Sequence, residues 1–276
     1  MESASANDNL VLGQLVPVSD GPERLTASVG GGSAEIYCNI SPDKASDNQD
    51  SLMLLQLDDD RAVLAVADGA GGIEGGRRAS RLALKMLRDV IVDPAFGHDS
   101  LRNAIISGIE HANAAVMSAT RGAATTLTVV SIEGREARVF HIGDSFALIT
   151  GQRSAVKLQT VAHSPVGFAI AAGFLTEEQA IYHPERHIVS NFVGTDEMVI
   201  EVGAPITLAK RDTVLVASDG LTDNLHMAEI TDMMRRGKAD QTLDAIVSLA
   251  RSRMTHREQH QPGKADDLAV ILFRKP

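Results

Sequence analysis

Short apolar runs that end in an acid and a glycine are the clearest pattern along this chain. Residues 61–67 form such a run, which stops at Asp68 and Gly69, and residues 213–217 form a second one, which stops at Asp219. Apolar runs of this length, rich in valine and bounded by polar residues, predict buried β-strands. Each of these strands therefore presents a carboxylate at its end.

A hairpin is predicted around the first of these runs. Residues 52–57 form another strand, residues 58–60 form an acidic turn, and residues 61–67 are expected to pair back antiparallel. This pairing places Asp50 and Asp68 at the same edge of one sheet. Acids gathered in this way usually need a cation to hold them together.

Longer segments repeat apolar residues every three or four positions, which predicts amphipathic helices. Two of them follow each other at residues 74–92 and 100–119, and two more are expected at residues 226–236 and 241–254. Because strands and helices are grouped and do not alternate one by one, we expect an α+β fold in which helical layers cover packed antiparallel sheets. The remaining strands are expected at residues 34–40, 125–132, 137–142, 146–150, 199–202 and 268–274.

The domain organisation is expected to be simple. Residues 1–32 mix Ser, Asn, Asp and Gly, which predicts a loosely ordered tail or a first edge strand. Residues 33–276 predict a single domain, since no linker or short repeat divides them. Within it, residues from about 152 to 195 are irregular, with a short helix that starts at Thr176. Long segments of this kind often form lids, so we expect a flap here.

The composition narrows the classes of function. The 276 residues carry a formal net charge of −10, aromatic residues make up 3%, and tryptophan is absent. An acidic surface with few stacking rings argues against nucleic acid and anionic membranes as partners. The single cysteine, Cys38, excludes an internal disulfide and fits a reducing compartment. With no signal-peptide pattern and no apolar run of membrane-spanning length, we expect a cytoplasmic protein.

Five acids are expected at strand ends or just before a strand. Taken singly, an aspartate beside glycine or serine is more often a turn former than a ligand. If all five converge, their mutual repulsion favours hard divalent cations such as Mg²⁺ or Mn²⁺, whereas no Cys and His spacing indicates zinc. His141 lies on an apolar strand and is expected to be a core residue. The five acids are Asp50, Asp68, Asp144, Asp219 and Asp266.

Short motifs surround these acids and follow one another along most of the chain. They are Asn48-Gln49-Asp50-Ser51, Asp68-Gly69-Ala70-Gly71-Gly72, Gly122-Ala123-Ala124-Thr125-Thr126, Gly143-Asp144-Ser145, Ser218-Asp219-Gly220-Leu221-Thr222-Asp223 and Asp266-Asp267. Each motif alone is a weak signal. The ordered set resembles the metal-dependent serine/threonine protein phosphatases of the type 2C family, in particular their bacterial branch.

The resemblance implies a four-layer α-β-β-α sandwich with a centre of two Mg²⁺ or Mn²⁺ ions at one end of the paired sheets. It implies that Asp68 bridges the two ions and that the carbonyl of Gly69 ligates one of them. Asp219 and Asp266 would hold the other ion, and Asp50 would orient metal-bound water.

The resemblance also implies the activity and a third ion. A third, weaker ion would bind at Asp144 and Asp223. The activity would be hydrolysis of phosphoserine and phosphothreonine by direct attack of a metal-activated water. Asp50 and Asp68 would be the catalytic residues, and they would act through this water. The partner would be a phosphorylated protein, and the enzyme would oppose a serine/threonine kinase.

The chain departs from the family pattern on the phosphate side. Ala45 stands where the family usually has a phosphate-binding arginine, and Lys44 beside it is the candidate replacement. Asp267 stands at a position that is usually Asn, so either Asp266 or Asp267 can be the ligand. Ala45, together with Gln49 in place of the more frequent Glu, keeps open a catalytically weak or inactive sensor or scaffold with the phosphatase fold. A two-metal hydrolase of small phosphoesters is the other alternative.

Overall fold

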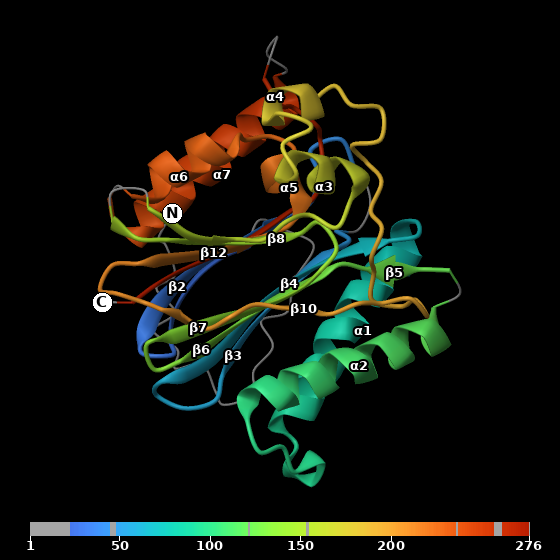
Figure 1. Cartoon of the computed structure of the whole chain (residues 1–276), viewed down its shortest axis with the longest axis vertical. Helices are drawn as coiled ribbons and strands as arrows, with labels where there is room; N and C mark the ends of the chain where they lie inside the picture. The colour runs from blue at the N-terminus through green and yellow to red at the C-terminus, as the bar shows by residue number, and fades with distance from the viewer. Residues whose placement is uncertain are drawn as a thin grey trace.

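Two antiparallel β-sheets that pack face to face form the centre of the molecule (Figure 1). The computed structural model of this chain describes all residues except 1–22, 45–47, 121, 153–154, 236, 257–260 and 276. Buried apolar side chains from both sheets meet in a shared core, and helices cover the outer face of each sheet. The layers follow the order α-β-β-α, so the predicted α+β sandwich is confirmed.

The first sheet contains six strands among the described residues, in the order β1-β2-β13-β12-β8-β9. Its central strands β12 and β13 consist almost entirely of buried residues, because one face contacts the other sheet and the other face contacts helices. In sheet order, the strands are β1 (Glu23–Val29), β2 (Gly32–Asn39), β13 (Leu268–Arg274), β12 (Thr213–Ala217), β8 (Phe146–Thr150) and β9 (Val156–Gln159).

The second sheet carries the predicted hairpin. Asp50 of β3 lies directly opposite Asp68 of β4 in the antiparallel register, so the expectation that these acids share one edge is confirmed. The path of this sheet runs β10-β7-β6-β4-β3, and β11 pairs with β7 while β5 pairs with β4. The strands are β3 (Asp50–Gln56), β4 (Arg61–Ala70), β5 (Ala124–Thr125), β6 (Leu127–Glu133), β7 (Glu136–Ile142), β10 (Glu201–Val202) and β11 (Ile206–Thr207).

Helix pairs cover both sheets: α1 and α2 pack on the second, and α6 and α7 on the first (Figure 1). Helix α2 buries Ile105, Ile109 and Ala112 on one face, and Ser100 caps its start by accepting a hydrogen bond from the backbone N–H of Asn103. The helices are α1 (Ile73–Val92), α2 (Leu101–Ala119), α3 (Pro165–Ala171), α4 (Glu177–Ala180), α5 (Asp219–Thr222), α6 (Met227–Met234) and α7 (Ala239–Thr255), with a 3-10 turn η1 (Pro94–Phe96).

The segment predicted as a flap contains two short helices among its described residues, whereas the sequence predicted one. Helix α4 begins where expected, at a capping box formed by Thr176 and Gln179. Helix α3 was not predicted. Ser164 before Pro165 is nevertheless a typical helix start, and the Ser164 hydroxyl accepts a hydrogen bond from the N–H of Gly167 at 2.9 Å. Both helices lie near α5 at one end of the first sheet (Figure 1).

The start of the chain is described from residue 23 onward. Residues 23–29 form the edge strand β1, which pairs with β2, while residues 1–22 lie outside the described residues. The predicted limits of the domain, residues 33–276, stay a prediction. Cys38 is buried in β2. In the described part of the chain, no helix has the length and apolar character needed to cross a membrane.

His141 lies in the buried part of β7, as its apolar surroundings predict. Its Nε2 donates a hydrogen bond to the carbonyl of Val161 at 3.0 Å, and its Nδ1 lies 3.0 Å from the hydroxyl of Thr128. Burial and the neighbouring His163 lower the pKa of His141 to about 4 from its ordinary value of 6.5. The imidazole is therefore neutral in the folded protein at neutral pH.

We expect His141 to make the folded state sensitive to acid. Because its pKa is about 4 in the folded protein and 6.5 when unperturbed, the unfolded chain binds the proton more readily between these values. The free energy of unfolding should fall as the pH is lowered from about 6.5 to about 4, by up to about 3 kcal/mol from this residue. Urea unfolding of wild type and His141→Gln across this range measures the effect, which should be smaller in the variant. Parallel pH curves for the two proteins would contradict it.

Candidate metal centre

The end of the β3–β4 hairpin supplies the first two acids. Asp50 is buried and Asp68 is partly buried, and the two are cross-strand partners. Burial raises the pKa of Asp50 to about 8. Burial and the negative charges of Asp50, Asp219, Asp144 and Asp266 raise the pKa of Asp68 well above its ordinary value. The predicted acids therefore converge closely enough to repel one another.

A buried serine ties the acids of the hairpin to the other sheet. Ser218 follows β12 of the first sheet and donates a hydrogen bond from its hydroxyl to Oδ2 of Asp50 at 2.6 Å. The same hydroxyl accepts a hydrogen bond from the N–H of Ala269 in β13 at 3.0 Å. The acid-bearing ends of the two sheets are thus joined by hydrogen bonds away from solvent.

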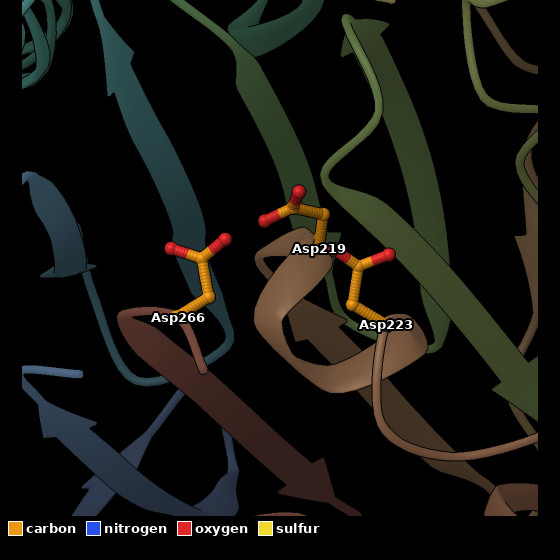
Figure 2. A group of neighbouring side chains, drawn as sticks. All are labelled: Asp219, Asp223 and Asp266. Carbon is orange, nitrogen blue, oxygen red and sulfur yellow. The ribbon is translucent and has the colours of Figure 1, made fainter. Parts of the chain in front are cut away.

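Three further acids come from the first sheet and from α5. Asp219 begins α5, Asp223 follows one turn later on the same side, and Asp266 lies just before β13 (Figure 2). One carboxylate oxygen from each of them lies within 4.8 Å of the others, and Figure 2 shows the three carboxylates side by side. Burial, together with Asp223 and Asp144, raises the pKa of Asp219 well above its ordinary value, although Lys264 opposes this shift. Such spacing fits a shared cation.

Glycines allow the close backbone contacts on which this geometry depends. A Cβ atom at Gly220 would lie 2.0 Å from the carbonyl oxygen of Asp267, so only glycine lets α5 start against the residue before β13. A Cβ atom at Gly69 would lie 2.1 Å from the carbonyl oxygen of Gly76 in α1. The glycines after Asp68 and Asp219 are therefore packing requirements as well as turn residues.

Asp266 and Asp267 have different surroundings. Asp267 is 2% exposed, and its carboxylate accepts hydrogen bonds from the N–H of Ser41, the N–H of Gln49 and the ammonium of Lys44, each at 2.8 Å. Asp267 thus anchors the loop that leads into β3. The side chain of Asp266 is 24% exposed and faces the other acids. These contacts favour Asp266 as the ligand.

Asp144 lies between β7 and β8. Its Oδ1 is buried and has no hydrogen-bond partner in the described part of the chain. Burial and the neighbouring Asp223 raise the pKa of Asp144 to about 6. Buried carboxylate oxygens without a donor are rare, and a cation is the usual partner. Together with the other carboxylates and the carbonyl of Gly69, this all-oxygen donor set fits a hard divalent ion such as Mg²⁺ or Mn²⁺.

Two lysines lie within the acid cluster, of which the sequence predicted only Lys44. The ammonium of Lys264 lies 2.6 Å from Asp223, 2.8 Å from Asp266 and 3.6 Å from Asp219. Burial alone would lower the pKa of Lys264, but the three carboxylates raise it well above its ordinary value. The signal in the sequence is a lysine two residues before the last acidic motif.

A cavity of about 310 Å³ adjoins the acids on the side of the flap. Gly167, Ile170 and Arg186 of the flap line one part of it, and Asp144 and Asp219 line another. The segment predicted as a flap therefore lines the same cavity as two of the acids, and a substrate chain could lie there.

A family model described as Protein phosphatase 2C matches residues 43–251 of this chain. Protein phosphatase PhpP of Streptococcus pneumoniae serotype 2 (strain D39) is 31% identical over 198 residues, which are 69% of this chain and 80% of that protein. Serine/threonine phosphatase stp of Listeria welshimeri serovar 6b is 23% identical over 237 residues, which are 83% of this chain and 90% of that protein.

Solved structures share the fold. The serine/threonine phosphatase of S. agalactiae aligns with a TM-score of 0.74 and 26% identity, over 88% of this chain and 100% of that chain. The PPM Ser-Thr phosphatase MsPP of Mycobacterium smegmatis, in complex with cacodylate, aligns with a TM-score of 0.71 and 25% identity, over 88% of this chain and 98% of that chain. The catalytic domain of serine threonine protein phosphatase PstP, in complex with 2 manganese ions, matches in fold with a TM-score of 0.70 and 22% identity, over 87% of this chain and 96% of that chain. The chain therefore belongs to the protein phosphatase 2C family of metal-dependent protein phosphatases, as the order of its motifs predicts.

Proposed function

We propose that this chain hydrolyses phosphoserine and phosphothreonine in proteins, with two Mg²⁺ or Mn²⁺ ions held by Asp68, the carbonyl of Gly69, Asp219 and Asp266. The observation that carries the proposal is the approach of Asp68, at the end of the second sheet, to Asp219 and Asp266 from the first. Burial raises the pKa of Asp68, and the charges of Asp219 and Asp266 add to this shift. This convergence needs compensating positive charge, which divalent ions supply.

When bound, such ions polarise a phosphate and lower the pKa of the water that attacks it. The residues of the chain have their own roles. Asp50 is held in one orientation by the hydroxyl of Ser218, so its carboxylate can accept a hydrogen bond from the attacking water. Gly71 and Gly72 are exposed beside Asp68 and have φ values of 108° and 85°, so backbone can approach a phosphate there without side chains in the way.

The nature of the substrate and of the ions has support from similar proteins. A serine/threonine phosphatase from S. agalactiae has the same fold at 26% identity, and the PstP catalytic domain is in complex with 2 manganese ions. We infer that a phosphorylated protein is the substrate and that the enzyme opposes a serine/threonine kinase. The single buried cysteine, Cys38, supports a reducing, cytoplasmic site of action. No observation on the described residues favours the scaffold or the small-phosphoester hydrolase.

Removal of one ligand tests the activity. We expect wild type to release phosphate from p-nitrophenyl phosphate and from a phosphothreonine peptide only with Mn²⁺ or Mg²⁺ present. Asp219→Asn should lose at least about 100-fold in kcat on both substrates, because it removes a charged ligand. Asp59→Asn, in the exposed β3–β4 turn, is the matched control and should keep full activity.

Two other outcomes would each contradict the proposed function. A wild type that binds Mn²⁺ but turns over neither substrate would favour the scaffold. Turnover of p-nitrophenyl phosphate alone would favour the hydrolase of small phosphoesters.

Asp266 and Asp267 should respond differently to the same substitution. Asp266→Asn should weaken Mn²⁺ binding at least about tenfold without lowering the free energy of unfolding, because it removes a ligand and some repulsion. Asp267→Asn should lower the free energy of unfolding by about 1–3 kcal/mol. The NH2 group of the asparagine would face donors that the Asp267 carboxylate now accepts, and it cannot accept their hydrogen bonds. Calorimetric Mn²⁺ titration and urea unfolding measure the two effects. The reverse pattern would make Asp267 the ligand.

Lys44 is proposed to bind the substrate phosphate in place of the absent arginine. Its ammonium contacts Asp267 at 2.8 Å and lies 4.0 Å from Asp266, so it borders the metal side of the site. Lys44→Gln should raise KM for p-nitrophenyl phosphate about tenfold with little change in kcat, whereas Lys44→Arg should keep KM near that of wild type. Lys85→Gln on the surface of α1 is the control. An unchanged KM in Lys44→Gln would show that Lys44 does not bind the phosphate.

A further inference from the structure

The ammonium of Lys264 occupies the centre of the trio of acids that has the spacing of metal ligands. It donates to Oδ2 of Asp223 at 2.6 Å, and it lies 2.8 Å from Oδ2 of Asp266 and 3.6 Å from Oδ2 of Asp219. These are the three residues whose carboxylate oxygens lie within 4.8 Å of one another. The ammonium of Lys264 therefore supplies positive charge where these three carboxylates repel one another.

The backbone holds Lys264 in this position. The N–H of Lys264 donates to Oδ1 of Asn224 at 3.0 Å, and Nδ2 of Asn224 donates back to the carbonyl of Lys264 at 2.8 Å. Asn224 is fully buried, follows Asp223 directly, and also donates to the carbonyl of Gly220 in α5. The backbone of Lys264 is thus held beside the segment that carries Asp219 and Asp223.

We propose that the Lys264 ammonium takes the place of a third divalent ion beside Asp219 and Asp223, so that this chain binds two divalent ions and not three. This inference rests on the proposed function, because it presupposes the two-ion centre at Asp68. It replaces the expectation that Asp144 and Asp223 bind a third ion. The positive charge of Lys264 also acts on Asp144, whose pKa it lowers against the effect of burial.

Competition for oxygens and repulsion between like charges both disfavour a divalent ion on Asp223 beside this ammonium. An ion ligated by Asp223 would lie about 2.0–2.1 Å from its oxygen, while the Lys264 nitrogen is 2.6 Å from Oδ2 of the same carboxylate. The two cations would compete for the same oxygens at a site that is partly shielded from water, where repulsion between like charges is strong. The ammonium belongs to the chain and already contacts Oδ2 of Asp223.

The contacts also indicate which ion is replaced. The shortest contact of Lys264 is with Asp223, which is not a ligand in the proposed two-ion set. Lys264 contacts Asp266 through Oδ2. The other oxygen, Oδ1, lies 4.0 Å from Lys44. When Asp219 and Asp266 ligate an ion, Lys264 can keep its contact with Asp223. The two-ion centre and the lysine can therefore coexist.

The number of bound ions tests this inference directly. Equilibrium dialysis against a Mn²⁺ series that extends into the millimolar range, with metal analysis, gives the ions bound per chain. We expect two for wild type and for the surface control Lys85→Met, and three for Lys264→Met, which keeps the length of the side chain without its charge. The double variant Lys264→Met/Asp223→Asn should return to two, because the ligand of the added ion is lost.

Asp223→Asn alone provides a second measurement, which stays informative if Lys264→Met fails to fold. If Lys264 replaces the ion, Asp223→Asn leaves Mn²⁺ stoichiometry at two; if an ion binds there, it removes one. Three ions in wild type, or two in a folded Lys264→Met, would overturn the inference while leaving the phosphatase intact. A raised KM in Lys264→Met with unchanged stoichiometry would assign Lys264 to phosphate binding instead. No Mn²⁺ binding by wild type would refute the proposed two-ion centre itself.

Discussion

The burial of like charges at the end where the two sheets meet is the constraint on which the rest of the site depends. Carboxylates repel one another and lose hydration when they are partly buried, so this end of the fold is held together by specific contacts. The hydroxyl of Ser218 joins Asp50 to the first sheet, and Asp267 accepts three donors from the segment that leads into β3. These bonds fix the two sheets against the repulsion, and the close contact at Gly220 lets α5 complete the cluster.

Much of this arrangement could be predicted from the sequence, because its signals are local. The strands at residues 146–150, 213–217 and 268–274 match the structure at both ends, since apolar runs with covered faces have clear limits. The opposition of Asp50 and Asp68 followed from a tight turn and the two-residue period of a strand. The resemblance of the ordered motifs supplied what the pattern alone could not, namely that acids far apart in the chain converge.

What could not be predicted depends on contacts between segments that are distant in sequence. The hydrogen bond from Ser41 to Asp267 joins residues 226 positions apart, and no pattern near either residue indicates it. The same holds for Lys264, whose backbone is hydrogen-bonded to Asn224 across 40 positions. Helix α3 is a different case, because Ser164 and Pro165 were a readable helix start within a segment interpreted as irregular.

Lys44 and Lys264 supply positive charge at two places in the acid cluster. Lys44 contacts Asp267, Lys264 contacts Asp223, and both lie within 4.0 Å of Asp266. The charges that act most strongly on Asp68 are those of other carboxylates. A lysine ammonium is a single compact charge, whereas a divalent ion can bind several oxygens and a phosphate at once. In the proposed two-ion centre, the ions at Asp68 would therefore concentrate the strongest positive field where a phosphate would react.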